Sequence, residues 1–189
     1  MNYLSAAYQG IRLAQYSRIA HLAGVGVAAP LAIAGYLLKT AYIPVTLLSG
    51  EAIASDLLFA LYDAPLWNMA LIASRLHLVW IATVCGKLKT DFRYSNTLGW
   101  NTFPVPTLTE KNRADLKSCA EEILLAREHH FPASIADLYD PDAMPDDLRA
   151  AHERNDEVLE RIYIGRRFKN DTERLEKLFA LYDKQRSAK

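Results

Sequence analysis

Two prolines near the middle of this chain, Pro104 and Pro106, constrain its fold most strongly. Proline fixes its own φ and keeps the preceding residue extended, so a helix or a central strand does not run through such a pair. Before the pair, short apolar runs rich in β-branched and aromatic residues accompany one helical pattern. After it, apolar residues recur at helical spacing between capping residues. We therefore predict an α+β N-terminal part, with short strands and one long apolar helix, followed by an all-α small helical bundle.

The N-terminal part should contain two strands, one helix and a looped segment. Residues 42–48 and 52–61 are predicted strands, because each is a short apolar run and a Ser-Gly pair lies between them. Pro65 suits the first turn of a helix, and apolar residues at three- and four-residue steps extend it to about Cys85, where a glycine ends it. Residues 87–106 are expected to be extended and partly looped.

The C-terminal part should be helical, because four helix-starting residues follow the proline pair: Thr109, Ser134, Pro145 and Asn170. They predict a helix of about 110–129, a short turn at SIADLYD, a helix to about Ile164, and a last helix begun by a capping box of Asn170 and Glu173. Amphipathic helices with short connections are typical of small bundles. We expect residues 107–189 to fold as an independent helical unit.

A cluster of cations and aromatic residues lies within residues 74–106. The cations Arg75, Lys87, Lys89 and Arg93 face one acid, Asp91, and are interleaved with Phe92, Tyr94 and Trp100. Cations at this spacing can neutralise phosphates, and rings or amides can contact bases and sugars. The alternative to a phosphate-binding segment is a solvent-exposed strand edge that follows the helix. Residues 1–106 carry seven Lys/Arg against four Asp/Glu, and residues 107–189 carry fifteen against eighteen, which favours a phosphate contact in the first part.

The candidate DNA contacts are Arg75, Lys87, Lys89, Arg93, Tyr94 and Asn96. The cations are expected at phosphates. Asn96 and Tyr94 could instead reach base edges or stack, since an asparagine amide matches N6 and N7 of adenine in the major groove. Arg166, Arg167 and Lys169 form a second candidate phosphate contact, with an exposed interhelical loop as the alternative.

Several strings in this sequence resemble one enzyme family. GKLKTDFRYS followed by the Asn-x-Phe-Pro of NTFPVP resembles the end of the target-recognition domain in MmeI-like (type IIL) restriction–modification enzymes. Residues 42–56 and 63–80 are similar to the segments before this block, and residues 134–163 and 173–184 to the family's helical C-terminal domain. The resemblance covers roughly residues 41–185.

The resemblance implies a domain organisation and a function. It implies an atypical apolar N-terminal segment at 1–40, the C-terminal part of a target-recognition domain at 41–106, and a helical C-terminal domain at 107–189. The resembled enzymes are single-chain DNA methyltransferases, fused to a nuclease, that methylate adenine at N6 with S-adenosylmethionine bound elsewhere in the chain. The expected partners are double-stranded DNA and the missing methyltransferase and nuclease domains.

Catalytic motifs of that family are missing from these 189 residues. There is no Asn-Pro-Pro-Tyr to grip a flipped adenine and no Gly-rich loop after a strand, and the Pro-Asp pairs have no following Glu-x-Lys. We therefore expect a C-terminal fragment that contributes target recognition and a helical support domain, with no catalytic, cofactor-binding or metal-binding residues. Two isolated cysteines, Cys85 and Cys119, fit reduced thiols in a cytoplasmic protein.

An uncharged run of twenty residues, 19–38, allows other interpretations. It is long enough to cross a bilayer as a helix, but its eight Ile, Leu and Val residues supply only about −2.4 to −4.8 kcal/mol of insertion free energy, opposed by three Gly, one Pro and His21. It could be a buried or poorly ordered segment, the anchor of a small membrane protein whose helices serve protein interaction, or the product of a frame slip or a truncated gene. The family resemblance favours the DNA-binding function.

Other residues that tempt a catalytic interpretation have plainer explanations. His77 lies in an apolar pattern and is expected to be a core histidine. His129 and His130 close a helix, where cations suit the helix dipole. A cluster of aspartates lies in a turn without the glycine and distal glutamate of a calcium loop: Asp137, Asp140 and Asp142.

Overall fold

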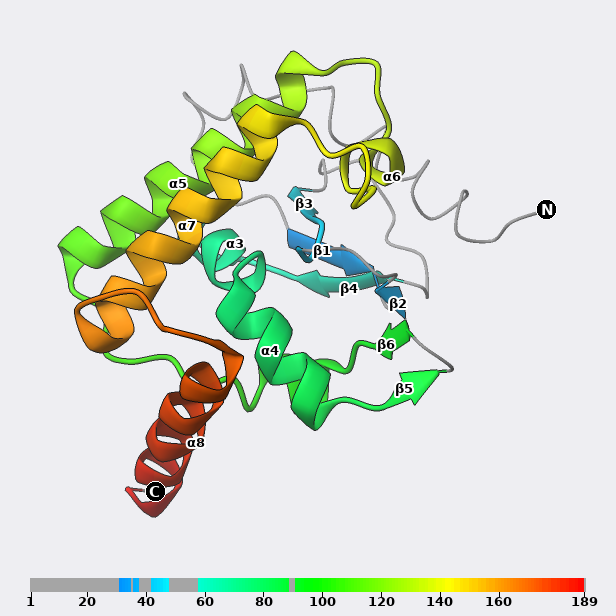
Figure 1. The fold of residues 1–189 in the computed structure, drawn as a ribbon. Coiled ribbons are helices and arrows are strands. Elements are labelled where there is room, and N and C mark those ends of the chain that lie inside the picture. The colour runs from blue at the N-terminus through cyan, green and yellow to red at the C-terminus, as the bar shows by residue number, and fades with distance from the viewer. Residues whose placement is uncertain (1–30, 35, 38–41, 48–57, 89–90, 189) are drawn as a thin grey trace.

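The computed structural model describes residues 31–34, 36–37, 42–47, 58–88 and 91–188 (Figure 1). The expectations for residues 1–30, including the first part of the uncharged run, lie outside these residues. The later part of that run forms two short strands, β1 (Leu31–Ala34) and β2 (Tyr36–Leu37). No helix among the described residues combines the length and the apolar character that crossing a membrane requires.

Among the described residues, the strands form two small antiparallel sheets. In the first, β1 lies between β3 (Val45–Leu47) and β4 (Leu58–Leu61), with Leu31 opposite both Leu47 and Leu61. In the second, β6 (Asp91–Arg93) lies between β2 and β5 (Lys87–Leu88). The predicted strands at 42–48 and 52–61 are thus confirmed over 45–47 and 58–61, and residues 48–57 lie outside the described part.

The predicted long apolar helix is wrong, because two helices stand in its place. Helix α3 (Trp67–Ile72) ends at Ala73, and α4 (Arg75–Val84) begins after Ser74, whose backbone is extended at ψ 156°. The Ser74 hydroxyl donates to the Leu71 carbonyl at 2.6 Å and accepts from the His77 amide at 3.2 Å. A serine that bonds the backbone in this way competes with helix continuation and caps the next helix instead.

The predicted C-terminal helices are confirmed. They are α5 (Glu110–His129), α6 (Ile135–Leu138), α7 (Asp146–Ile164) and α8 (Asp171–Ser187). Thr109 and Ser134 cap as expected, and Gly165 ends α7 at φ 78°, a left-handed conformation that favours glycine. The capping box of the last helix is incomplete. Asn170 accepts from the Glu173 amide, but Glu173 itself accepts from the Lys169 amide at 2.6 Å.

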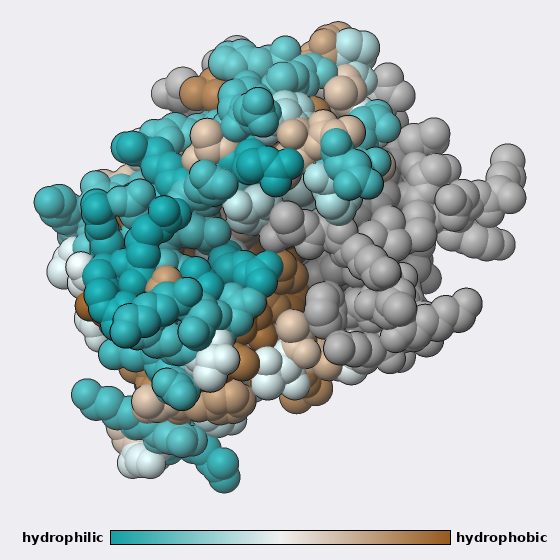
Figure 2. Space-filling view, in the orientation of Figure 1, coloured by the Kyte–Doolittle hydropathy of each residue, from teal (hydrophilic) through white to brown (hydrophobic). Residues whose placement is uncertain are grey.

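The hydrophobic core continues across the proline pair. Helix α3 packs against α5, and α4 packs against α8, within one cluster of buried residues (Figure 1). Two buried bonds also join the parts, from the Asn155 amide to the Ala70 carbonyl at 2.9 Å and from the Tyr163 hydroxyl to the Pro104 carbonyl at 2.8 Å. Figure 2 shows that hydrophilic residues cover much of the outer face over α5, α7 and α8. The helical part therefore buries its apolar faces on the strand-containing part.

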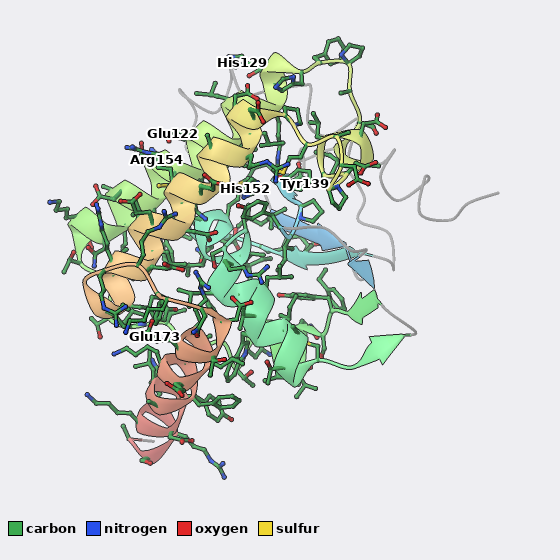
Figure 3. All side chains as sticks on the ribbon, in the orientation of Figure 1. Glu122, His129, Tyr139, His152, Arg154 and Glu173 are labelled. Carbon is green, nitrogen blue, oxygen red and sulfur yellow. The ribbon has the colours of Figure 1, made fainter. Side chains whose placement is uncertain are left out.

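A buried polar cluster reinforces this junction. Arg127 on α5 is fully buried and donates to the Tyr139 hydroxyl at 2.8 Å and to the Val45 carbonyl of β3 at 2.5 Å. His152 on α7 lies 2.7 Å from the Tyr139 hydroxyl, and its ring stacks on Tyr42 with centroids 4.2 Å apart. Figure 3 labels His152 and Tyr139. Burial lowers the pKa of His152 well below its usual value, so the ring is neutral beside the Arg127 cation.

Candidate nucleic-acid interface

A hairpin directly after α4 holds three of the predicted phosphate contacts. Strands β5 and β6 pair antiparallel, with Lys87 opposite Phe92 and Leu88 opposite Asp91. Lys87 and Arg93 therefore stand on neighbouring strands, one residue out of register. Lys89 lies in the connection between them, outside the described residues. The topology brings these three positions into one short hairpin.

A single turn of π-helix follows the hairpin. This element, η1 (Asn96–Trp100), is capped by the Ser95 hydroxyl, which accepts from the Leu98 amide at 3.2 Å. Its first three residues are exposed, whereas Gly99 is buried against α4. A β-carbon on Gly99 would lie 3.2 Å from Ile81 and 3.4 Å from both Cys85 and Tyr94, so only glycine allows this approach without displacing neighbours. Close packing on one side thus presents Asn96 to solvent on the other.

Asn96 is the predicted base contact that the structure leaves accessible. Its Oδ1 accepts from the Thr97 amide at 2.8 Å and from the Thr97 hydroxyl at 3.3 Å. Among the described residues, its Nδ2 amide has no acceptor. An asparagine with a free amide donor on an exposed turn can form new hydrogen bonds to a ligand.

Tyr94 lies inside the fold, beneath η1. Its side chain is 2% exposed, and its ring packs against Phe59 and His77 with centroids 5.4 and 5.8 Å apart. Burial raises the pKa of its hydroxyl. Tyr94 would have to leave the core to stack on a base, because its ring is buried. The sequence pattern did not reveal which face of the chain this residue occupies. Its position instead supports η1.

Arg75 has partners within the protein. It stands at the start of α4, about 15 Å from the hairpin along the helix axis. Its Nη2 lies 2.5 Å from Asp171 Oδ2, and its backbone amide donates to Asp156 Oδ1 at 2.7 Å. Hydrogen bonding to Asp171 raises the pKa of Arg75. The structure therefore separates Arg75 from the other predicted contacts and gives its charge a partner on α8.

The second candidate phosphate contact is partly neutralised. Glu173 forms ion-paired hydrogen bonds with Arg166 and lies at the start of α8 (Figure 3). Bonding to Arg166 lowers the pKa of Glu173 to about 2, so this carboxylate stays charged. Arg167 and Lys169 are exposed. The alternative prediction of an exposed interhelical loop describes this segment well.

His77 is a core histidine, as predicted. It is fully buried, its Nδ1 lies 3.2 Å from the Ile72 carbonyl, and burial lowers its pKa to about 4. His130 lies 2.7 Å from Asp147 on α7. Asp137 belongs to the capping box of α6, and Asp140 accepts from the Asp142 amide at 3.0 Å, which is turn chemistry.

Both cysteines are buried free thiols, and burial raises the pKa of Cys119 to about 11. In the part of the chain that the structure describes, no group of three or more His, Cys, Asp or Glu side chains is arranged to hold a metal ion.

Two family models match this chain in succession. The MmeI target recognition domain matches residues 38–107, which contain the hairpin and η1, and the MmeI C-terminal domain matches residues 108–188, which contain α5 to α8. The chain belongs to the MmeI family. It corresponds to the C-terminal part of such proteins, so the resemblance predicted from the sequence is confirmed.

Relatives of this MmeI-family chain are much longer. DNA methyltransferase A of Bacillus subtilis (strain 168) is 41% identical over 141 residues, which are 75% of this chain and 16% of that protein. The solved structure of the type IIL restriction-modification enzyme MmeI in complex with DNA matches with a TM-score of 0.81 and 25% identity, over 98% of this chain and 26% of that chain. The chain thus spans about a sixth to a quarter of the relatives it matches.

Proposed function

We propose that this chain supplies DNA target recognition within a restriction–modification DNA methyltransferase, while methyl transfer is carried out by residues outside it. The match of residues 38–107 to the MmeI target recognition domain carries this proposal. The MmeI structure that resembles this chain was solved with DNA, which supports a DNA partner. Within the matched part, the basic hairpin and the exposed η1 adjoin each other in sequence. The methyltransferase and nuclease domains of the longer enzyme are the proposed protein partners.

The hairpin and η1 would make different kinds of contact. Lys87, Lys89 and Arg93 would neutralise phosphates, which gives affinity without sequence preference. Asn96 would offer its Nδ2 to adenine N7 and accept from adenine N6 at Oδ1, replacing the bond from the Thr97 hydroxyl. The three cations fix the position of the duplex, and Asn96 distinguishes its base sequence.

Among the described residues, the glycines form no loop that would hold S-adenosylmethionine. Gly99 packs against α4, and Gly165 ends helix α7 and does not follow a strand. Neither glycine therefore belongs to a glycine-rich cofactor loop between a strand and a helix. The sequence also lacks the Asn-Pro-Pro-Tyr that would hold a flipped adenine. We therefore assign the cofactor and the methylation of adenine N6 to other parts of the longer enzyme, and place that enzyme in the cytoplasm with its DNA substrate.

The membrane-anchored alternative is not retained. Leu31–Ala34 and Tyr36–Leu37, which belong to the uncharged run, pair as strands with residues 45–47, 58–61 and 91–93. A bilayer-spanning helix across 19–38 would break both sheets. The family membership explains the rest of the chain without an anchor.

The chain alone is expected to transfer no methyl group to DNA. The measurement incubates it with labelled S-adenosylmethionine and duplexes of random sequence, and counts label in the DNA. A full-length relative serves as the positive control. Transfer above background by the chain alone would place catalytic residues inside it and refute the proposal that methyl transfer is carried out by residues outside this chain.

Replacing Asn96 by alanine is expected to reduce sequence preference. A duplex selected from a random pool by the wild-type chain is compared with a scrambled duplex by fluorescence anisotropy. The difference in binding free energy should fall by about 1–3 kcal/mol, with the salt dependence unchanged, because a base contact and not a phosphate contact is lost. Asn112→Ala, on α5, is the matched control. Equal discrimination by the wild type and Asn96→Ala would exclude a base contact at this residue.

A further inference from the structure

The placement of η1 depends on a buried tryptophan in α4. Trp80 is 1% exposed, and its indole Nε1 donates to the Thr102 hydroxyl at 3.1 Å. That hydroxyl in turn donates to the Leu98 carbonyl, which belongs to η1. The Thr102 oxygen therefore accepts one bond and donates one, and joins α4 to the turn that carries Asn96.

The ring of Trp80 also contacts the last helix. Its ring centroid lies 5.2 Å from that of Phe179 and 5.7 Å from that of Tyr182, both on α8. These distances and tilted orientations are those of favourable aromatic pairs. Trp80 thus contacts α8 through its ring and η1 through the Thr102 hydroxyl. Asp171, at the start of the same α8, pairs with Arg75 at the start of α4.

We infer that Trp80 and Thr102 form a positioning relay that ties the location of η1, and of Asn96 on it, to helix α8 of the C-terminal domain. The domain would thereby determine how the recognition turn meets DNA, beyond supporting the fold. The relay is a contiguous set of contacts from Phe179 and Tyr182 through Trp80 and Thr102 to Leu98. Its effect on DNA specificity rests on the proposed function, whereas its effect on η1 does not.

Thr102→Val tests the relay, because valine keeps the shape of threonine and loses the hydroxyl. In the full chain without DNA, the amides of Gly99 and Asn101, which donate to the Ser95 and Asn96 carbonyls, are expected to exchange hydrogen about two- to tenfold faster than in the wild type. Thr102→Ser keeps the hydroxyl and should restore wild-type exchange. Wild-type exchange in Thr102→Val would overturn the relay.

The α8 end is tested separately. Phe179→Ala should also speed exchange at these two amides, because it removes the ring contact with Trp80. Leu125→Ala, an exposed apolar side chain on α5, is the control and should leave their exchange unchanged. Slower or equal exchange in Phe179→Ala would show that α8 does not act on η1.

DNA binding then separates the two proposals. Thr102→Val should lower the preference of the chain for its selected duplex over a scrambled one by about two- to tenfold, with the salt dependence retained, and Thr102→Ser should restore it. A wild type without any duplex preference would refute the proposed recognition function while the exchange measurements still decide the relay. Faster exchange with unchanged preference would overturn the link from relay to specificity.

Discussion

The isolated segment 107–189 is expected to lose cooperative folding, which reverses the independent unit that its helix caps predicted from the sequence. Its apolar faces are buried against α3 and α4 in one shared core. Exposing a large apolar side chain costs about 1.5–3 kcal/mol. A few such exposures equal the whole net stability of a domain, which is about 5–15 kcal/mol.

Particular residues show how much the fragment would lose. Phe179 and Tyr182 would lose Trp80, and His152 would lose the stacked ring of Tyr42. Arg127 would lose its bond to the Val45 carbonyl, which lies outside the fragment. Local capping survives truncation, but each cap contributes only about 1 kcal/mol.

Circular dichroism measures this outcome. The fragment 107–189 should show reduced helicity and a broad, non-cooperative melt, whereas the full chain and a fragment of residues 31–189 should melt cooperatively. The longer fragment is the matched comparison because it keeps β1, β2 and the α3–α4 pair together with Tyr42 and Val45. A sharp, helix-rich melt of 107–189 near that of the full chain would contradict the shared-core account.

The ends of the C-terminal helices could be predicted because their signals are local. Thr109 and Asn170 accept hydrogen bonds from backbone amides three residues later, and Pro145 precedes α7 as expected. Lys117 and Glu121, four residues apart on α5, form an exposed ion pair with an N–O distance of 3.5 Å. Each of these features depends on residues within one turn of a helix.

One local feature was not predicted, because Ser74 fits the apolar helical spacing although its hydroxyl caps α4 and divides the predicted helix. Features that depend on distant residues could not be predicted. Arg75 appears as a free cation in the sequence, but Asp171, its partner, lies 96 residues later. The burial of Tyr94 likewise follows from the packing of η1 on α4.

Arg127 did leave a signal that was overlooked. It follows Leu116, Ala120 and Ile123 at three- and four-residue steps, so it lies on the buried stripe of α5. An arginine on such a stripe indicates a buried guanidinium with hydrogen-bond partners, because an unpaired buried charge is costly. Its acceptors, the Tyr139 hydroxyl and the Val45 carbonyl, come from other elements and could not be named from the sequence.

Replacing Lys87, Lys89 and Arg93 together by alanine is expected to have the largest effect on DNA binding. Each lost phosphate contact reduces the slope of log K against log salt by about 0.9, so three contacts reduce it by almost three. At about 0.1 M salt, the same relation gives a loss of roughly tenfold per contact. The loss should be equal for all duplex sequences, because phosphates carry no sequence information.

A control variant separates this effect from a change in net charge. Lys111, Lys184 and Arg186 are exposed on α5 and α8 and also comprise two lysines and one arginine. Replacing them by alanine removes the same charge from the helical domain. DNA binding by this control variant should change only modestly, since the variant leaves the hairpin intact.

Fluorescence anisotropy of the wild type, the hairpin variant and this control, titrated with duplex DNA at several salt concentrations, tests the central claim most directly. We predict strongly salt-dependent binding by the wild type and the control, with a slope smaller by about two to three in the hairpin variant. Salt-independent binding by the wild type, or equal slopes for the wild type and the hairpin variant, would contradict the assignment of the hairpin as the DNA contact.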